Sequence, residues 1–306
     1  MSATERWPAL PPGEWEETRT TLHLWMQIVG KIRLALAPME NHWWQVALYV
    51  NARGLTTSAM PYAGGVVELT FDFQEHVLRV ETSAGASRAV ALAPRSVADF
   101  YHEVLATLRD VGVGVHISRF PSEMEQIIPF DEDETHAAYN GDAARLLWRV
   151  LLDVDRVLHE FRGRFIGKCS PVHFWWGGFD IAVTRFSGRE APPHPGGIPN
   201  LPDWVTREAY SHECMSVGWW PGGGAVTEPA FYAYAYPEPA GCPTAPISPA
   251  AAYYHGELRE WILPYEAVRT AANPDSELLS FLQSAYDTVA RLGKWDPALE
   301  RSKPPA

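Results

Sequence analysis

The sequence predicts an α+β fold in which antiparallel β-sheets carry helices packed on one side. Four long segments place apolar residues at helical spacing, whereas the segments between them alternate apolar and polar residues or are rich in aromatic and β-branched residues. The strand-like segments follow one another across turns instead of alternating with helices, which disfavours a parallel sheet. The order helix, strands, helix occurs twice. We therefore expect two α+β halves, 1–125 and 126–306, either as separate units or as one compact unit.

The first half begins with a predicted helix over 15–37, which Pro38 ends because proline cannot continue the helical hydrogen bonding. A second helix is predicted from its N-cap Ser96 to Arg109. Four segments are predicted strands by their aromatic, β-branched or alternating residues: 43–53, 66–80, 88–92 and 112–118. The acidic, proline-containing segment 120–140 is expected to connect the two halves along the surface.

The second half opens with a predicted helix over 142–161, whose apolar residues form one stripe. It closes with a predicted helix over 276–292, which Asn273 or Asp275 would cap. Four strand-like segments lie between these helices: 172–186, 208–218, 230–236 and 251–264. Loops rich in proline and glycine separate them, so a meander of antiparallel strands is the simplest arrangement.

The composition argues against several classes of protein. A net charge of −12 disfavours a nucleic-acid partner, which would require a clustered basic face. The 3 cysteines include no Cys-x-x-Cys pair, so neither a disulfide framework nor a zinc ribbon is expected. No apolar stretch of about 18 residues and no signal peptide are recognisable, so we expect no membrane association and a cytoplasmic location. The 13 tryptophans indicate an aromatic core, pocket or interface.

Three of the predicted strands carry a histidine among aromatic residues. Because side chains alternate between the two faces of a strand, three groups each share one face: His173 with Trp175, His212 with Tyr210, and His255 with Tyr253 and Glu257. Tyr234 lies with two further tyrosines on one face of 230–236. In a meander, one face of the sheet would then present histidines, a carboxylate and tyrosines, which is a typical composition for a small-molecule pocket.

Two chemistries fit this face. In the first, His173, His212 and His255 hold a divalent metal such as zinc, iron or manganese, with Glu257 as a further ligand. In the second, these histidines and Glu257 act as general acids or bases in a metal-free pocket. No segment has the spacing of a ligand motif such as His-Glu-x-x-His, and strand histidines commonly bond only to backbone or tyrosine, so a structural role also stays open.

Other residues could complete such a site. Arg185 would hold an anionic group of a substrate, or it would form a surface ion pair. Cys169 beside Lys168 would be an activated nucleophile, or a small residue without chemistry. Asp180 interrupts an apolar run and is expected to be a buried, hydrogen-bonded carboxylate. Polar residues of the first half that neighbour tryptophans would either reach the pocket or only pack and cap: His23, Gln27, Lys31 and 41–44.

Several segments together resemble a known family: 21–34 (TLHLWMQIVGKIRL), 41–44 (NHWW), 94–101 (PRSVADFY), 128–131 (IPFD), 165–173 (FIGKCSPVH) and 228–237 (EPAFYAYAYP). This family is an uncharacterised bacterial one, known only as a domain of unknown function. The resemblance extends from about Trp7 to Trp295. It implies a soluble bacterial protein of this length, and it carries no activity, cofactor or catalytic residue to transfer.

The residues therefore favour an enzyme that acts on a small polar or anionic metabolite through a pocket of histidines and carboxylates, with or without a metal. The alternative is a non-catalytic protein that binds a small molecule in a cavity lined by tryptophan and tyrosine. A third, weaker hypothesis is an interaction module that presents its surplus tryptophans on an exposed surface.

Overall fold

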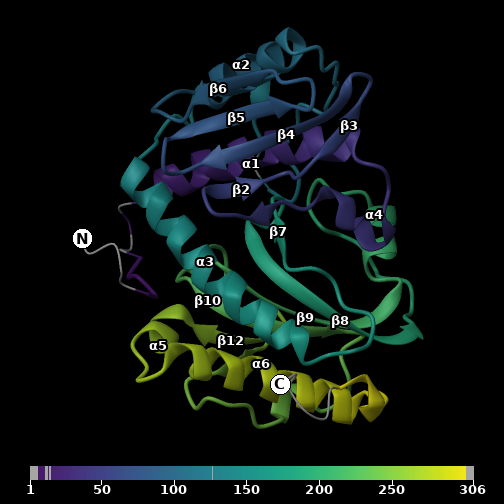
Figure 1. Cartoon of the computed structure of the whole chain (residues 1–306). Helices are drawn as coiled ribbons and strands as arrows, with labels where there is room; N and C mark the ends of the chain where they lie inside the picture. Colours follow the sequence, from purple (N-terminus) through teal and green to yellow (C-terminus); the bar gives the residue numbers. More distant parts are fainter. Residues whose placement is uncertain (1–5, 11–12, 14, 126, 301–306) are drawn as a thin grey trace.

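The computed structural model describes residues 6–10, 13, 15–125 and 127–300. In this part of the chain, two antiparallel sheets of 6 strands each are combined with α-helices, which confirms the predicted α+β class (Figure 1). Each sheet is built from strands of one half of the chain, and helices of the same half pack against it.

The first sheet has the order β1-β2-β4-β5-β6, and β3 pairs with β4. Its strands are β1 (Tyr49–Val50), β2 (Gly54–Thr56), β3 (Met60–Tyr62), β4 (Gly65–Asp72), β5 (Val77–Thr82) and β6 (Ser87–Ala91). Helices α1 (Glu16–Leu36) and α2 (Val97–Asp110) pack together on it. Stacked rings join α1, α2 and β4. The ring centroid of Phe100 in α2 lies 4.6 Å from that of Trp25 in α1 and 6.5 Å from that of Phe71 in β4.

The second sheet has the order β11-β12-β10-β9-β8-β7. Its strands are β7 (His173–Trp175), β8 (Asp180–Glu190), β9 (His212–Trp220), β10 (Ala230–Tyr236), β11 (Tyr253–His255) and β12 (Glu260–Pro264). Helices α3 (Gly141–Gly163) and α6 (Pro274–Leu292) cover one face, and α5 (Tyr265–Arg269) follows β12. The other face is flanked by the 3₁₀-helix η1 (Asn41–Val46) and by α4 (Asp203–Ala209). Three further 3₁₀-helices are η2 (Phe130–Glu132), η3 (Cys242–Thr244) and η4 (Pro297–Leu299).

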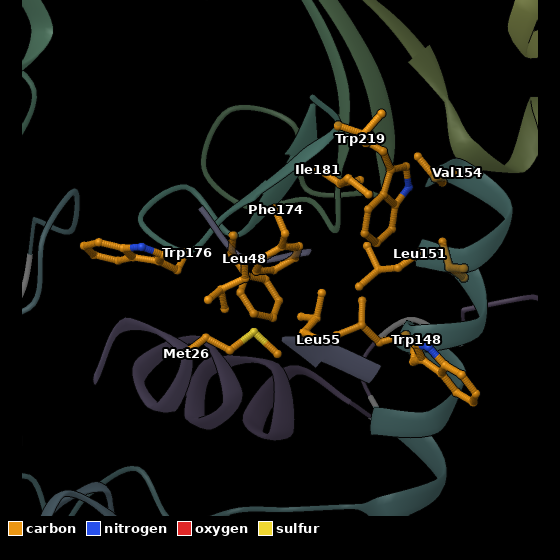
Figure 2. Packing of buried hydrophobic residues seen from close by; sticks show 14 of the residues in the cluster. Met26, Leu48, Leu55, Trp148, Leu151, Val154, Phe174, Trp176, Ile181 and Trp219 are labelled. Atoms are coloured by element: carbon orange, nitrogen blue, oxygen red, sulfur yellow. The ribbon is translucent and has the colours of Figure 1, made fainter. Parts of the chain in front are cut away.

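One hydrophobic core runs through both halves. Leu48, just before β1, and Phe174 of β7 exchange two backbone hydrogen bonds of 2.9 and 2.8 Å. Helix α3 contacts both β1 and β8, and Figure 1 shows it passing from one sheet to the other. Figure 2 shows the shared core between the sheets, with contributions from α1, α3 and both sheets: Met26, Leu48, Leu55, Trp148, Leu151, Val154, Phe174, Trp176, Ile181 and Trp219.

Three predicted strands are in fact hairpins. The segments 66–80, 172–186 and 251–264 each contain two strands joined by a short turn. Each turn ends in a non-glycine residue with left-handed backbone, namely His76 (φ 54), Phe179 (φ 58) and Arg259 (φ 59). Such residues are uncommon at positive φ, and none of these turns has the Asn-Gly or Asp-Gly pair that marks a hairpin in a sequence. This is why the segments looked like continuous strands.

Two other strand predictions are wrong. Segment 43–53 forms a strand only at Tyr49–Val50, because η1 holds His42 and Trp43 in left-handed conformations. Tertiary hydrogen bonds stabilise this shape, since Trp43 Nε1 donates to the Val205 carbonyl at 3.0 Å. Segment 112–118 has no strand, although Val113 and Ile117 are buried as the alternation requires. Burial on one side is thus possible without a neighbouring strand to pair with. The start of 208–218 belongs to α4, and β9 begins at His212.

Candidate functional site

A pocket of about 700 Å³ lies on the face of the second sheet opposite α3 and α6. Its walls come from the sheet, from η1 and the end of α1, from loop residues 118–123, and from the segment 198–210 that contains α4. Ten of the lining residues are aromatic: Trp43, Trp44, Phe120, Trp175, Trp176, Phe186, Trp204, Tyr210, Tyr232 and Tyr234. Both halves of the chain therefore build the pocket.

The sheet supplies a polar floor. Strand pairing places Asp180, Thr184, Ser216 and Tyr232 on the same face of β8, β9 and β10. Thr184 Oγ1 and Ser216 Oγ are 3.0 Å apart, and the Tyr232 hydroxyl donates to the Asp180 carboxylate. Alternate residues of these strands, such as Arg185, point into the core instead. The period of two thus separates the residues that face the pocket from those that face the helices.

The loop at Ser122 is fixed to α1 by three hydrogen bonds. Gln27 Nε2 donates to the Ser122 carbonyl at 2.9 Å, and the Ser122 backbone N–H donates to Gln27 Oε1 at 2.8 Å. Lys31 Nζ donates to Ser122 Oγ at 2.7 Å. All three bonds are buried, so the loop that forms this wall is held rigidly against the helix.

Glu123 follows this clamp and has a left-handed backbone with φ 61, which is unusual for a residue with a side chain. Its backbone N–H donates to the Pro199 carbonyl at 3.0 Å. The Glu123 carboxylate lies against Gly177, where an added Cβ would overlap it. Among the described residues, no hydrogen-bond donor or cation lies within bonding distance of this carboxylate. The fold therefore positions a carboxylate in the pocket without using it for a contact of its own.

Burial shifts the proton affinities of the polar groups in the pocket. It raises the pKa of the Asp180 carboxyl to about 7, although the hydrogen bond from Tyr232 acts in the opposite direction. The Glu123 carboxylate is exposed to the pocket but enclosed by protein, and this raises its pKa despite the nearby Lys31 amine. Burial also lowers the pKa of Lys31 to about 8, with Glu123 opposing the shift. Asp180 and Lys31 therefore titrate closer to neutrality than usual.

Of the three predicted histidines, His173 lies beside the pocket without lining it. It is fully buried behind Trp44, Tyr49 and Trp175, and neither ring nitrogen has a hydrogen-bond partner in the described part of the chain. Burial lowers its pKa to about 3. His212 contacts the ring of His42 and is likewise not part of the pocket lining. Neither histidine is placed as an acid or base for a ligand in this pocket.

The structure does not bring the predicted metal ligands together. Strand pairing puts His173, His212 and His255 on one sheet face, but β7 and β11 are opposite edges of a six-stranded sheet. At roughly 4.8 Å per strand, His173 and His255 are about 24 Å apart, whereas a zinc ligand lies about 2 Å from its ion. Within residues 6–300, as far as they are described, no group of three or more His, Cys, Asp or Glu side chains could hold a metal ion.

His255 and Tyr253 instead line a smaller cavity of about 270 Å³ at the β11 edge. Glu257 is exposed in the turn that follows β11. Trp175, Tyr210 and Tyr234 do line the main pocket, and the hydroxyls of Tyr210 and Tyr234 are 2.6 Å apart. The predicted aromatic residues of β7 and β10 thus meet at one pocket, while the β11 residues belong elsewhere.

Two further candidates face away from the pocket or are inert. Arg185 is fully buried on the helix side of the sheet, where its guanidinium lies 3.4 Å from the ring centroid of Phe161 and 4.4 Å from that of Tyr286. It forms no ion pair with the described residues, and it is not part of the pocket lining. Burial raises the pKa of the Cys169 thiol to about 11, so Cys169 is not an activated nucleophile.

Sequence reasoning missed Glu123 and underrated Lys31. Lys31 and His42 do line the pocket, as the tryptophan-flanked polar residues of the first half suggested. Glu123 lay in a segment interpreted as a surface connection, and nothing in Pro121-Ser122-Glu123 signals a left-handed glutamate. The sequence feature that could have indicated this part of the pocket is the pair Gln27 and Lys31. These two polar side chains lie one turn apart on the buried face of an apolar helix.

Comparison with known proteins places this chain in a family. It belongs to DUF5996, a family of unknown function, whose model matches residues 7–301. This confirms the resemblance to a domain of unknown function over nearly the whole chain. No curated protein and no solved structure matches the chain. None of the helices in the described part of the chain combines the length and apolarity needed to cross a membrane.

Proposed function

We propose that this protein binds a small molecule with an aromatic or apolar body in the main pocket, and that Lys31, Glu123 and Asp180 contact the polar part of that molecule. The volume of about 700 Å³ falls within the range of ligand pockets, which is roughly 300–1,000 Å³. An aromatic lining with a few converging polar groups is the composition that such pockets share. The three free cysteines suit a reducing compartment, and we propose the cytoplasm as the location.

The placement of Glu123 carries this proposal. A left-handed backbone at a residue with a side chain costs stability, and a carboxylate without a partner among the described residues gives no bond in return. Strained residues held by a rigid surrounding structure are concentrated at binding and catalytic sites. The three bonds that clamp Ser122 provide that rigid surrounding here.

A second candidate function is acid–base catalysis on the bound molecule. It is favoured by the shift of the Asp180 pKa to about 7, since a general acid or base is most efficient when its pKa is near the working pH. Asp180, Glu123 and Lys31 would be the proton-transferring groups, in place of the histidines expected from the sequence.

Ligand-observed NMR with a library of aromatic fragments tests the binding proposal. We expect fragments with a polar substituent to bind wild-type protein. Glu123→Gln should weaken their binding by about tenfold, which corresponds to the loss of about 1.4 kcal/mol of interaction with the carboxylate. Glu257→Gln makes the same chemical change outside the pocket and should bind like wild type. Ser118→Trp, at an exposed lining position, should block binding. The proposal fails if no fragment binds, or if bound fragments are insensitive to both pocket variants.

A further inference from the structure

We propose that Lys31 is a nucleophile that forms an imine with an aldehyde or ketone held in the main pocket. This inference rests on the proposed binding function and names the ligand class: a carbonyl compound with an aromatic or apolar body. It also gives the buried amine a role beyond fastening the Ser122 loop.

The surroundings of the Lys31 amine favour its neutral form. The side chain lines the pocket and is only 6% exposed. An ammonium has three N–H donors, yet among the described residues Nζ has one acceptor, Ser122 Oγ at 2.7 Å, and no carboxylate within ion-pair distance. The Trp176 ring centroid is 5.5 Å from Nζ, near the outer limit of a cation–π contact, so the ring replaces only part of the lost solvation of an ammonium. A buried ammonium with one hydrogen bond is poorly solvated, whereas a neutral amine at the same place keeps a lone pair free to attack.

This environment increases the fraction of reactive amine. Burial lowers the pKa of Lys31 from 10.5 to about 8. At pH 7 a pKa of about 8 leaves roughly a tenth of the amine neutral, which is about 300-fold more than for an amine of pKa 10.5. The charged group that acts on Lys31 in the described chain is Glu123, and its other neighbours Ser122 and Trp176 are neutral.

The chemistry needs no oxidant or reductant. The Nζ lone pair attacks the carbonyl carbon, the C–N bond forms, and the carbonyl π electrons move to oxygen, which takes up a proton. Nitrogen gives up its first proton, which completes the carbinolamine. The carbinolamine hydroxyl then takes up a second proton and leaves as water while the nitrogen lone pair forms the C=N bond, and nitrogen gives up its remaining proton. Amine and carbonyl thus become imine and water. Each step needs a group that donates and accepts protons near neutral pH, and Glu123 and Asp180 provide carboxyls with raised pKa for this purpose.

Reductive trapping tests the inference in the full-length protein. The probe is 2-naphthaldehyde with sodium cyanoborohydride, which reduces an imine to a stable amine. Intact mass and peptide mapping then locate the adduct among the four lysines of the chain: Lys31, Lys168, Lys294 and Lys303. We expect one adduct per chain at Lys31, formed at pH 7 at least tenfold faster than at the exposed Lys294. The Lys31 rate should rise with a midpoint near pH 8, and 2-naphthalenemethanol should compete with labelling because it fills the same pocket but cannot condense.

Variants separate reactivity from folding. Lys31→Arg keeps a donor for Ser122 and should abolish the adduct, and an unchanged thermal unfolding transition would show that the variant is folded. Glu123→Gln should slow trapping by about tenfold, and Glu257→Gln should not. If the alcohol binds but the label spreads over the lysines without preference, the imine inference is overturned and the binding function stands. If the alcohol does not bind and Lys31 is not preferred, both are overturned.

Discussion

The two faces of the second sheet bury a cation in opposite ways. On the helix face, the Arg185 guanidinium is enclosed by the rings of Phe161 and Tyr286 and donates to the Phe161 carbonyl. On the pocket face, the Lys31 amine reaches the ligand space with one hydrogen bond and a carboxylate nearby. Neither cation has an ion pair within 4 Å among the described residues.

The difference shows two ways to lower the free-energy cost of burying a cation. Aromatic rings enclose Arg185, whereas Lys31 can lose its charge. Burial lowers the pKa of Arg185 only to about 10, so it stays charged near neutral pH and depends on the aromatic faces around it. Lys31, with a pKa of about 8, can release its proton. The helix face is closed, so its cation serves packing alone, whereas the pocket face leaves its titratable groups accessible to a ligand.

The largest effect is expected on the closed face. Arg185→Ala should lower the free energy of unfolding by about 3 kcal/mol, because it leaves a cavity between the rings of Phe161, Phe165 and Tyr286 and removes their cation. Arg185→Met fills the same space without charge and should be at least as stable as wild type, since apolar replacements of buried ions often are. Urea unfolding measures both. Equal destabilisation by the two variants would mean that the charge itself, and not the filled volume, stabilises this face.

A methyl group on the pocket side should disturb binding more than folding. In Gly177→Ala, the new Cβ overlaps the end of the flexible Glu123 side chain, which can swing away. We expect the free energy of unfolding to change by less than about 1 kcal/mol. The affinity for fragments and the rate of Lys31 trapping should each fall by about tenfold. Gly114→Ala is the matched control, because nothing lies within 4 Å of its added Cβ. A Gly177→Ala protein that binds and reacts like wild type would contradict the role of Glu123.

The smallest expected effect is a pH dependence at Asp180. Its pKa is raised to about 7 in the folded protein from 3.8, so the folded state holds more protons than the unfolded state between these values. This carboxyl therefore contributes stability at low pH that is lost as the pH rises through about 7. Asp180→Asn mimics the protonated form, so its stability relative to wild type should be greater at pH 8 than at pH 5. Thermal unfolding at both pH values checks this, and a difference that does not depend on pH would refute it.

Much of the fold was predictable from local patterns. The four long helices were placed within a few residues, because their apolar stripes and the caps Ser96 and Asn273 are encoded within each segment. The antiparallel class followed from strands separated by turns. The hairpin turns were missed, and their left-handed residues are His76, Phe179 and Arg259 instead of glycine.

The pocket was less predictable. Period-two alternation correctly grouped Trp175 with His173 on one face of β7, but it could not say which strands are neighbours. The edge-to-edge separation of β7 and β11 depends on strand order, which connects residues far apart in the chain.

The sequence by itself determined the α+β class, the helices, the family and the aromatic character of the chain, because each depends on composition or on contacts within a short segment. Only the tertiary structure decided which polar residues share the pocket. Lys31, Glu123 and Asp180 come from a helix, a loop and a strand separated by long stretches of sequence, and they meet because one core packs both halves together. Their shifted pKa values arise from that enclosure, so they too are properties of the folded protein.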